Sequence, residues 1–206
     1  SGGTTVYYSN TLYIEDRSLG SGPVDLYGAL IVRYANGRLF DSADNPLDVN
    51  IYGGSVQLDS NSAVHLDRWG DSTPAHLYTG RLRLTGMNGT ETIGDLTFTG
   101  GSYVEVSRSS SNTAILDAGT LTRESFGTLI LTHTAGQLGA AAQFQVANGA
   151  DYTPGGVETV GAIAKPYIIS GSSNQFVAYT GTGFDEVAWT DTSGFPSPGT
   201  GAELVQ

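Results

Sequence analysis

The sequence predicts an all-β fold, a right-handed parallel β-helix in a single domain, and three observations lead to it. A strand motif of glycine followed by apolar residues at the second and fourth positions recurs along the chain. Its first three copies begin at Gly28, Gly54 and Gly80, a spacing of 26 residues each time. The chain also has 29 glycines and only 14% charged residues, which suits short strands and tight turns. A fixed repeat is typical of solenoids, because one unit cannot bury its apolar face alone.

The apolar positions of residues 28–105 coincide when the three 26-residue blocks are superposed. Three places in the block are apolar, which predicts about three strands per block and therefore three parallel sheets. Alternate side chains should face inward, and equivalent residues of successive coils should lie about 4.8 Å apart. The columns are Leu30, Val56 and Leu82; Val32, Leu58 and Leu84; Ile51, Leu77 and Tyr103; and, in part, Phe40 and Leu66.

The regions on either side of these blocks are less regular. Residues 106–192 should form less regular coils, and 193–206 a Pro/Gly-rich tail, for about eight or nine coils in all. The expected inward pairs are Leu96 and Phe98, Val104 and Val106, and Leu129 and Leu131. Strands are also expected at 167–169, 175–179 and 186–189. Residues 1–27 hold strand-forming segments that either cap the first coil or pair with a neighbouring subunit.

Several segments between residues 92 and 188 resemble those of autotransporter-associated β-strand repeat proteins. The similar segments are Ile93–Phe98, Leu121–Arg123, Gly127–Leu131 and Tyr167–Tyr179, together with Pro166-Tyr-Ile followed by Asn174, Phe176 and Tyr179. The resemblance covers roughly half of the chain, and its motifs are of low complexity. It implies a β-helix displayed on a bacterial cell surface, extracellular and without catalysis.

The composition disfavours two classes of partner. The formal net charge is −11 with a single lysine, whereas nucleic acid and anionic membrane surfaces attract clustered Lys and Arg. No stretch approaches the roughly 18 apolar residues of a membrane-spanning helix. The chain has no cysteine, which excludes disulfides and thiolate metal sites. We therefore expect neither nucleic-acid binding nor membrane insertion.

The superposed blocks bring aspartates together at one corner. Asp41 and Asp67 fall in one column, Asp44 and Asp71 lie a few residues beyond them, and Asp48 closes the corner. Like charges roughly 5 Å apart on adjacent coils repel unless a cation bridges them or one carboxyl is protonated. Calcium prefers oxygen ligands, so Asp41, Asp44, Asp67 and Asp71 are candidate calcium ligands. The alternative is that these loops project into solvent, where screening weakens the repulsion and no cofactor is needed.

An enzyme or binding domain acting on polysaccharides is the main alternative to a structural role. A glycoside hydrolase needs two carboxylates about 5 to 9.5 Å apart. A lyase needs a base beside a calcium-bound uronate, and an exposed aromatic ring should flank the sugar. The candidates are Asp41, Asp67 and Asp71 for the carboxylates, Arg68 or Lys165 for the base, and Trp69 for the ring. A site for a sugar carboxylate at Arg81 and Arg83 is a further option, although these arginines fit the outward face of an ordinary strand.

The sequence favours a non-catalytic structural or adhesive protein. The ends of a β-helix expose unpaired backbone groups, which must be covered or paired with another chain. Strand-forming segments near both ends therefore predict that copies of the chain stack end to end into a bacterial surface fibre. A monomeric adhesin fragment is the alternative, and surface glycans are the other expected partners.

Overall fold

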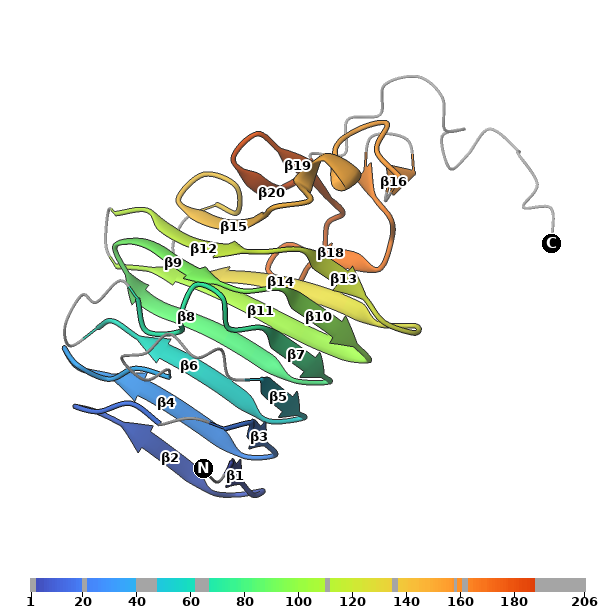
Figure 1. The fold of residues 1–206 in the computed structure, drawn as a ribbon. Coiled ribbons are helices and arrows are strands. Elements are labelled where there is room, and N and C mark those ends of the chain that lie inside the picture. Colours follow the sequence, from blue (N-terminus) through green and yellow to red (C-terminus); the bar gives the residue numbers. More distant parts are fainter. Residues whose placement is uncertain are drawn as a thin grey trace, which may run out of the picture.

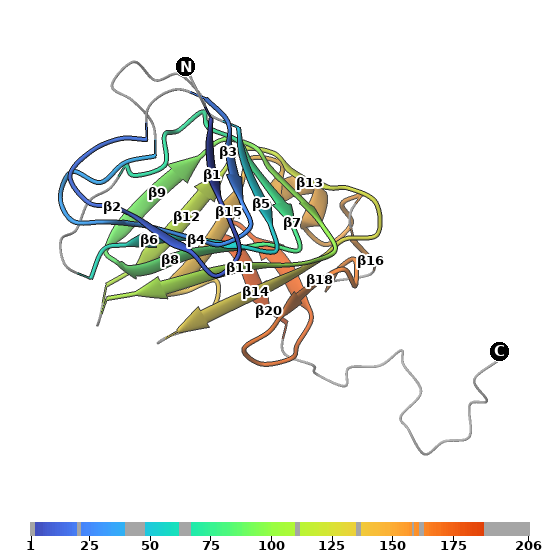
Figure 2. The same ribbon diagram turned by 90° about the horizontal axis from the view of Figure 1, so that it is seen from below.

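In a computed structural model of the chain, the strands stack into a right-handed parallel β-helix (Figure 1). The structure describes residues 3–19, 22–39, 48–61, 67–109, 112–134, 137–157, 159–160 and 163–187. Seen from the amino-terminal end in Figure 2, the chain runs clockwise while it moves away from the viewer, which is the right-handed sense. The predicted fold class is confirmed. Within the described ranges, no helix has the length and apolar character needed to cross a membrane.

Three parallel sheets, here named A, B and C, run along the axis. Sheet A contains β1 (Thr4–Val6), β3 (Val24–Leu26), β5 (Val49–Tyr52), β7 (Ala75–Tyr78), β10 (Leu96–Thr99) and β13 (Leu121–Arg123). Sheet B contains β2 (Thr11–Ile14), β4 (Ala29–Arg33), β6 (Ser55–Asp59), β8 (Arg81–Met87), β11 (Gly101–Arg108), β14 (Thr128–Thr134) and β18 (Ile168–Ser170). Sheet C contains β9 (Gly89–Ile93), β12 (Ala114–Ala118) and β15 (Ala142–Val146).

The register of sheet B confirms two of the predicted columns. The partners across β4, β6 and β8 are Leu30, Val56 and Leu82 in one column and Val32, Leu58 and Leu84 in the other. All six side chains are buried, while their neighbours along each strand, except Thr85, are at least partly exposed. The three predicted inward pairs of the later coils are buried as well. Full burial of one such side chain stabilises the fold by about 1.5–3 kcal/mol, so this stack is the main source of stability.

The third column holds only in part. Ile51 lies opposite Leu77 as predicted, but the next residue in that column is Phe98, and the placement of Tyr103 was wrong. Tyr103 lies in sheet B opposite Arg81. The coil that follows β7 is shorter than 26 residues. In the earlier coils a loop joins sheet B to sheet A along the third side of the β-helix, whereas in this coil the strand β9 occupies that side. Phe40 and Leu66, the fourth column, lie outside the described residues.

The carboxy-terminal part leaves the regular ladder. It contains the 3-10 helix η1 (Gly149–Tyr152) and two antiparallel hairpins, β16 (Thr159–Val160) with β17 (Ile163–Ala164) and β19 (Val177–Thr180) with β20 (Gly183–Glu186). Sheet B therefore has seven described strands, fewer than the eight or nine coils expected. The strands predicted at 167–169 and 175–179 correspond to β18 and β19. β20 begins earlier than the strand predicted at 186–189 and shares only Glu186 with it, and residues from 188 onward lie outside the described part.

Candidate functional site

The amino-terminal end of the β-helix has two open strand edges. β1 and β2 form the first coil, and among the described strands each pairs on one side only, with β3 and β4 respectively. The N–H of Thr4 donates to Pro23 O, and Asn10 O accepts from the N–H of Ala29, so these groups face the second coil. Successive residues of a parallel strand direct their backbone groups to opposite sides. The N–H and C=O of Thr5 and Tyr13 therefore face outward from the end.

Exposed aromatic rings gather at the same end. Tyr7 is 66% exposed, Tyr8 68% and Tyr13 48%, and all three belong to the first coil. Two shallow hollows lie beside them, one of about 370 Å³ lined by Tyr7, Tyr8 and Tyr27 among others, and one of about 470 Å³ lined by Tyr13 and its neighbours in the chain. Exposed aromatic rings grouped at one end of a molecule mark an interaction site more often than single scattered ones do.

A ladder of stacked tyrosines leads from this end along the helix. Tyr27 and Tyr52 stack with ring centroids 5.0 Å apart, and Tyr52 and Tyr78 with centroids 4.7 Å apart. Tyr7 continues the stack at 6.5 Å from Tyr27. The inner rings of the ladder stack face to face on each other. Tyr7 and Tyr8 are therefore the rings exposed at its open end.

The carboxy-terminal end is covered, in contrast. Phe184 is fully buried and lies against Phe144, Tyr152 and Tyr179, with ring centroids 5.1 to 5.6 Å apart. It closes the interior as a plug. At the amino-terminal end the interior is less completely covered, because the inward residue Leu12 of the first coil is only partly buried, whereas its partner Leu30 is fully buried.

Side chains also occupy the strand edges at the carboxy-terminal end. Asn148 Oδ1 accepts from the N–H of Leu121 in β13 at 3.0 Å, and Asn148 Nδ2 donates to Leu121 O at 3.1 Å. The hydroxyl of Tyr152 donates to the same carbonyl at 3.1 Å. Tyr179 Oη does the same for β15, because it both accepts from the N–H and donates to the carbonyl of Val146. On β18, the N–H of Ser170 donates to Gln175 O.

The predicted calcium corner is only partly within the described residues. Asp41 and Asp44 lie outside them, so the column with Asp67 stays a prediction. Asp67 and Asp71 are exposed on the loop between β6 and β7. In the part of the chain that the structure describes, no three His, Asp or Glu side chains come close enough to hold a metal ion.

The residues proposed for sugar chemistry do not form one site. Trp69 was expected to be an exposed ring, but it is fully buried and its indole N–H donates to Thr73 O at 2.7 Å. Arg68 is fully buried as well and donates to the carbonyl of Tyr34 at 2.7 Å. Neither can meet a polysaccharide, so both assignments are wrong. Lys165 lies in the carboxy-terminal part of the chain, beside a hollow of about 420 Å³ that Arg123 and Asp151 also line.

Glu91 is a buried carboxyl that the sequence reasoning missed. It points inward from β9 and accepts three backbone N–H groups in a row, from Asp67 at 3.0 Å and from Arg68 and Trp69 at 2.7 Å each. It thereby ties the loop after β6 to the first strand of sheet C. Burial raises the pKa of Glu91 from 4.5 to about 7, against the opposing effect of the three hydrogen bonds. The available signal was the alternation of side-chain direction along Thr90, Glu91 and Thr92. Glu91 takes the inward position in this alternation, since it is the Cα partner of the inward residue Leu116.

A second polar cluster joins the hairpin β19–β20 to sheet B. Ser170 and Ser173 both donate hydroxyl hydrogen bonds to Glu186 Oε1, at 2.5 and 2.7 Å, and His133 Nε2 lies 3.4 Å from the same oxygen. Burial would raise the pKa of Glu186, but the serine hydroxyls and His133 outweigh it and lower that pKa. Both hydroxyls bond the carboxylate rather than the imidazole, so this is not the serine–histidine contact that activates a nucleophile. It is a latch for the terminal hairpin.

No protein-family model, curated protein or solved structure matches this chain. The resemblance to autotransporter-associated β-strand repeat proteins therefore stays a prediction. The β-helical fold, the open amino-terminal end and the covered carboxy-terminal end rest on the chain's own geometry.

Proposed function

We propose that this protein is a non-catalytic structural or adhesive β-solenoid that associates with a second copy of itself through its amino-terminal end. The observation that carries the proposal is the asymmetry of the two ends. Strand edges and core are covered by side chains at the carboxy-terminal end, and both edges are open at the amino-terminal end. An extracellular, bacterial-surface location belongs to the same proposal and is supported by the sequence resemblance.

Within the described residues, the strands at the open edges lack two features that usually prevent pairing with another chain, a charged residue and a proline. Soluble proteins protect an edge with a charged residue, a proline, a bulge or a covering loop. β1 is Thr-Thr-Val and β2 is Thr-Leu-Tyr-Ile, so neither strand contains a charge or a proline. Pairing would satisfy the outward backbone groups of Thr5 and Tyr13 and would bury the rings of Tyr7 and Tyr8.

The asymmetry also favours a particular geometry. A fibre needs an open surface at both ends, because each copy must contact one neighbour in front and one behind. Here the covered carboxy-terminal end favours a symmetric contact in which two amino-terminal ends meet, and such a contact closes at a dimer. The end-to-end fibre expected from the sequence is thus replaced by a head-to-head pair as the assembly we propose.

Sedimentation equilibrium over a range of concentrations tests this proposal, with Thr5→Pro as the variant. Proline removes the outward N–H of Thr5, and that N–H is not used within sheet A, so the fold should persist. We expect a concentration-dependent dimer, and a dissociation constant that rises about tenfold or more in Thr5→Pro, which corresponds to about 1.4 kcal/mol. Thr5→Val is the matched control, since it keeps the N–H and should dimerise like the wild type.

Three results would count against the proposal. These are a monomer at every concentration, equal dimerisation by Thr5→Pro with an unchanged circular dichroism spectrum, or open-ended filaments in electron micrographs. Filaments would show that the carboxy-terminal end also takes part in assembly.

A further inference from the structure

A groove lies along the corner where sheet A turns into sheet B. The repeated glycine motif makes this corner, and the tightly spaced coils leave no room for a side chain there: a Cβ on Gly54 would lie 2.3 Å from Gly28 O. The resulting hollow measures about 410 Å³. Tyr27 and the glycines line it from the corner, and Arg81, Arg83 and Tyr103 line it from sheet B. Tyr27 lines both this groove and the hollow at the open end, whereas Arg81, Arg83 and Tyr103 belong to later coils.

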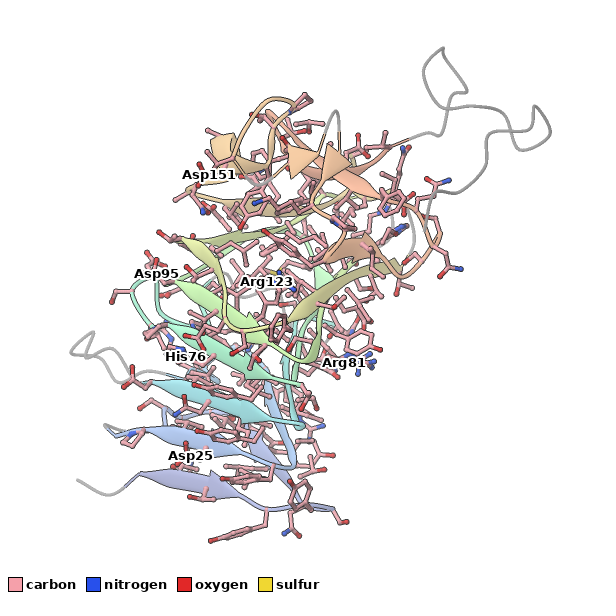
Figure 3. All side chains as sticks on the ribbon, turned by 90° about the vertical axis from the view of Figure 1, so that its right-hand side faces the viewer. Asp25, His76, Arg81, Asp95, Arg123 and Asp151 are labelled. Carbon is pink, nitrogen blue, oxygen red and sulfur yellow. The ribbon has the colours of Figure 1, made fainter. Side chains whose placement is uncertain are left out.

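Arg81 gives the groove a positive charge that nothing in the described part of the chain neutralises. Its guanidinium lies over the ring of Tyr103, 4.7 Å from the centroid, and its side chain is exposed (Figure 3). Arg83, two residues along the same strand, is held by both carboxylate oxygens of Glu105, at 2.9 and 3.2 Å. Arg33 is likewise paired with Glu15. In a chain with a net charge of −11, an arginine that lies over an aromatic ring and has no carboxylate partner among the described residues is well placed to bind an anionic ligand.

The backbone at Thr79, on the lining of the same groove, is in a conformation unusual for its residue type. Its φ is +56°, in the left-handed region that β-branched residues rarely adopt. In the preceding coil the corresponding position after the stacked tyrosine is Gly53, with φ +71°. Strained residues of this kind gather at binding and catalytic sites, because elsewhere a glycine would serve better. Thr79 places a hydroxyl on the groove where glycine would leave none.

We propose that this groove binds a segment of an acidic polysaccharide, with a uronate carboxylate against the guanidinium of Arg81. Arginine matches a carboxylate with two parallel hydrogen bonds, and the ring of Tyr103 holds the guanidinium in place for this contact. The hydroxyl of Ser55 and the phenol of Tyr27 are then available for the sugar hydroxyls, and Thr79 Oγ1, which donates its own hydrogen to Tyr78 O, can accept a hydrogen bond from one of them. The tyrosine ladder runs along the same corner with spacings of 4.7 and 5.0 Å, so similar phenol groups recur from coil to coil along an extended chain. This inference does not depend on dimerisation through the amino-terminal end.

Isothermal titration calorimetry of the full chain with tetragalacturonate tests the proposal. A chelator in every sample removes calcium bridging as the cause of binding. Methyl-esterified tetragalacturonate is the matched ligand control, since it keeps the sugar and loses the charge, and hexaglutamate is the control for an acidic peptide. We expect tetragalacturonate to bind more weakly as salt is raised, and both controls to bind about tenfold or more weakly at low salt.

Variants locate the binding. Arg81→Gln should weaken tetragalacturonate binding about tenfold or more. The affinity of Arg81→Lys should lie between those of Arg81→Gln and the wild type, because lysine keeps the positive charge but cannot form the two parallel hydrogen bonds of a guanidinium. Arg33→Gln is the matched control on the same sheet and should bind like the wild type. Thr79→Gly should melt at a higher temperature and bind tetragalacturonate more weakly.

The proposal is overturned if tetragalacturonate gives no heat, if the methyl ester or hexaglutamate binds as tightly, or if Arg81→Gln binds like the wild type. A Thr79→Gly variant with unchanged affinity would overturn the assignment of the strained backbone to binding. Melting curves for each variant show whether a loss of binding reflects a loss of folding.

Discussion

The two ends of this β-helix differ in how far side chains cover the interior and the edges of the last strands. At the carboxy-terminal end, Phe184 fills the interior and the side chains of Asn148 and Tyr179 take the hydrogen bonds that another strand would take. At the amino-terminal end, Leu12 is only partly covered and the strand edges are open. A solenoid repeats one packing arrangement along its length, so its ends are where chains of the same fold differ most. The comparison separates an end that side chains cover from an end whose described strand edges they leave open.

Sheet C adds an intermediate case, because it begins in the middle of the molecule. Its first strand, β9, has no strand before it among the described residues. The loop after β6 lies there instead, fixed by the three hydrogen bonds to Glu91. A sheet edge that starts inside the fold is thus closed by a buried carboxyl and a loop, whereas neither covers the amino-terminal edges among the residues that the structure describes.

The largest effect should follow from removing the plug. Phe184→Ala is expected to lower the free energy of unfolding by about 3–5 kcal/mol, since it leaves a cavity among three aromatic rings. Phe126→Ala is the matched control, because Phe126 is 92% exposed and its loss should change stability by less than about 0.5 kcal/mol. Urea unfolding followed by circular dichroism measures both. Similar midpoints for the two variants would mean that the terminal hairpin does not close the core.

Much of the ladder was predictable because its register is a property of spacing. Columns such as Leu30, Val56 and Leu82 follow from a constant coil length and from strict alternation within each strand. The prediction failed at Tyr103, where a strand replaced a loop and shortened the coil. Trp69 was misplaced for a related reason. A tryptophan among charged residues looks like surface, but here the loop folds inward so that its backbone can reach Glu91.

The sites were less predictable than the fold, because they depend on contacts between distant coils. Nothing near Asn148 in the sequence shows that its amide will bond Leu121, which is 27 residues earlier. Glu91 was within reach of prediction once β9 was placed against β12, but although three parallel sheets were expected, no strand was predicted at Gly89–Ile93. The suggestion of a sugar carboxylate at Arg81 could be made from the strand pattern, while the aromatic partner of Arg81 required the corrected position of Tyr103.

The internal edge at Glu91 should give the fold a pH dependence. The folded pKa is about 7 and the ordinary value is 4.5, so between these pH values the folded chain holds a proton that the unfolded chain has lost. The stabilisation is complete below pH 4.5 and is lost as the pH rises through 7, on the order of 3 kcal/mol in total. Urea unfolding at a series of pH values measures this slope. Glu91→Gln should remove it, and Glu124→Gln, an exposed control, should keep it. An equal slope in the wild type and Glu91→Gln would contradict the assignment.

A smaller effect is expected at the edge of sheet A that side chains cover. Asn148→Ala removes both hydrogen bonds to Leu121 and should lower the free energy of unfolding by about 1–3 kcal/mol, because a backbone group loses its partner. The hydroxyl of Tyr152 still reaches the carbonyl of Leu121, which limits the loss. Asn36→Ala is the control, since Asn36 makes an exposed bond to Asp16 at 3.3 Å. Hydrogen exchange at the Leu121 amide should speed up in Asn148→Ala and stay unchanged in the control.

The smallest effect should come from the first coil of the isolated chain, and association should enlarge it. Leu12→Ala is expected to cost about 1 kcal/mol in dilute solution, because Leu12 is only partly buried, whereas Leu82→Ala should cost about 2–5 kcal/mol. If two amino-terminal ends meet, the contact covers Leu12, and its replacement then weakens the dimer as well as the monomer. The difference in unfolding free energy between Leu12→Ala and the wild type should therefore grow with protein concentration, while that of Leu82→Ala stays constant. A difference independent of concentration would mean that the partial burial of Leu12 is permanent, and that the first coil remains exposed to solvent in the working protein.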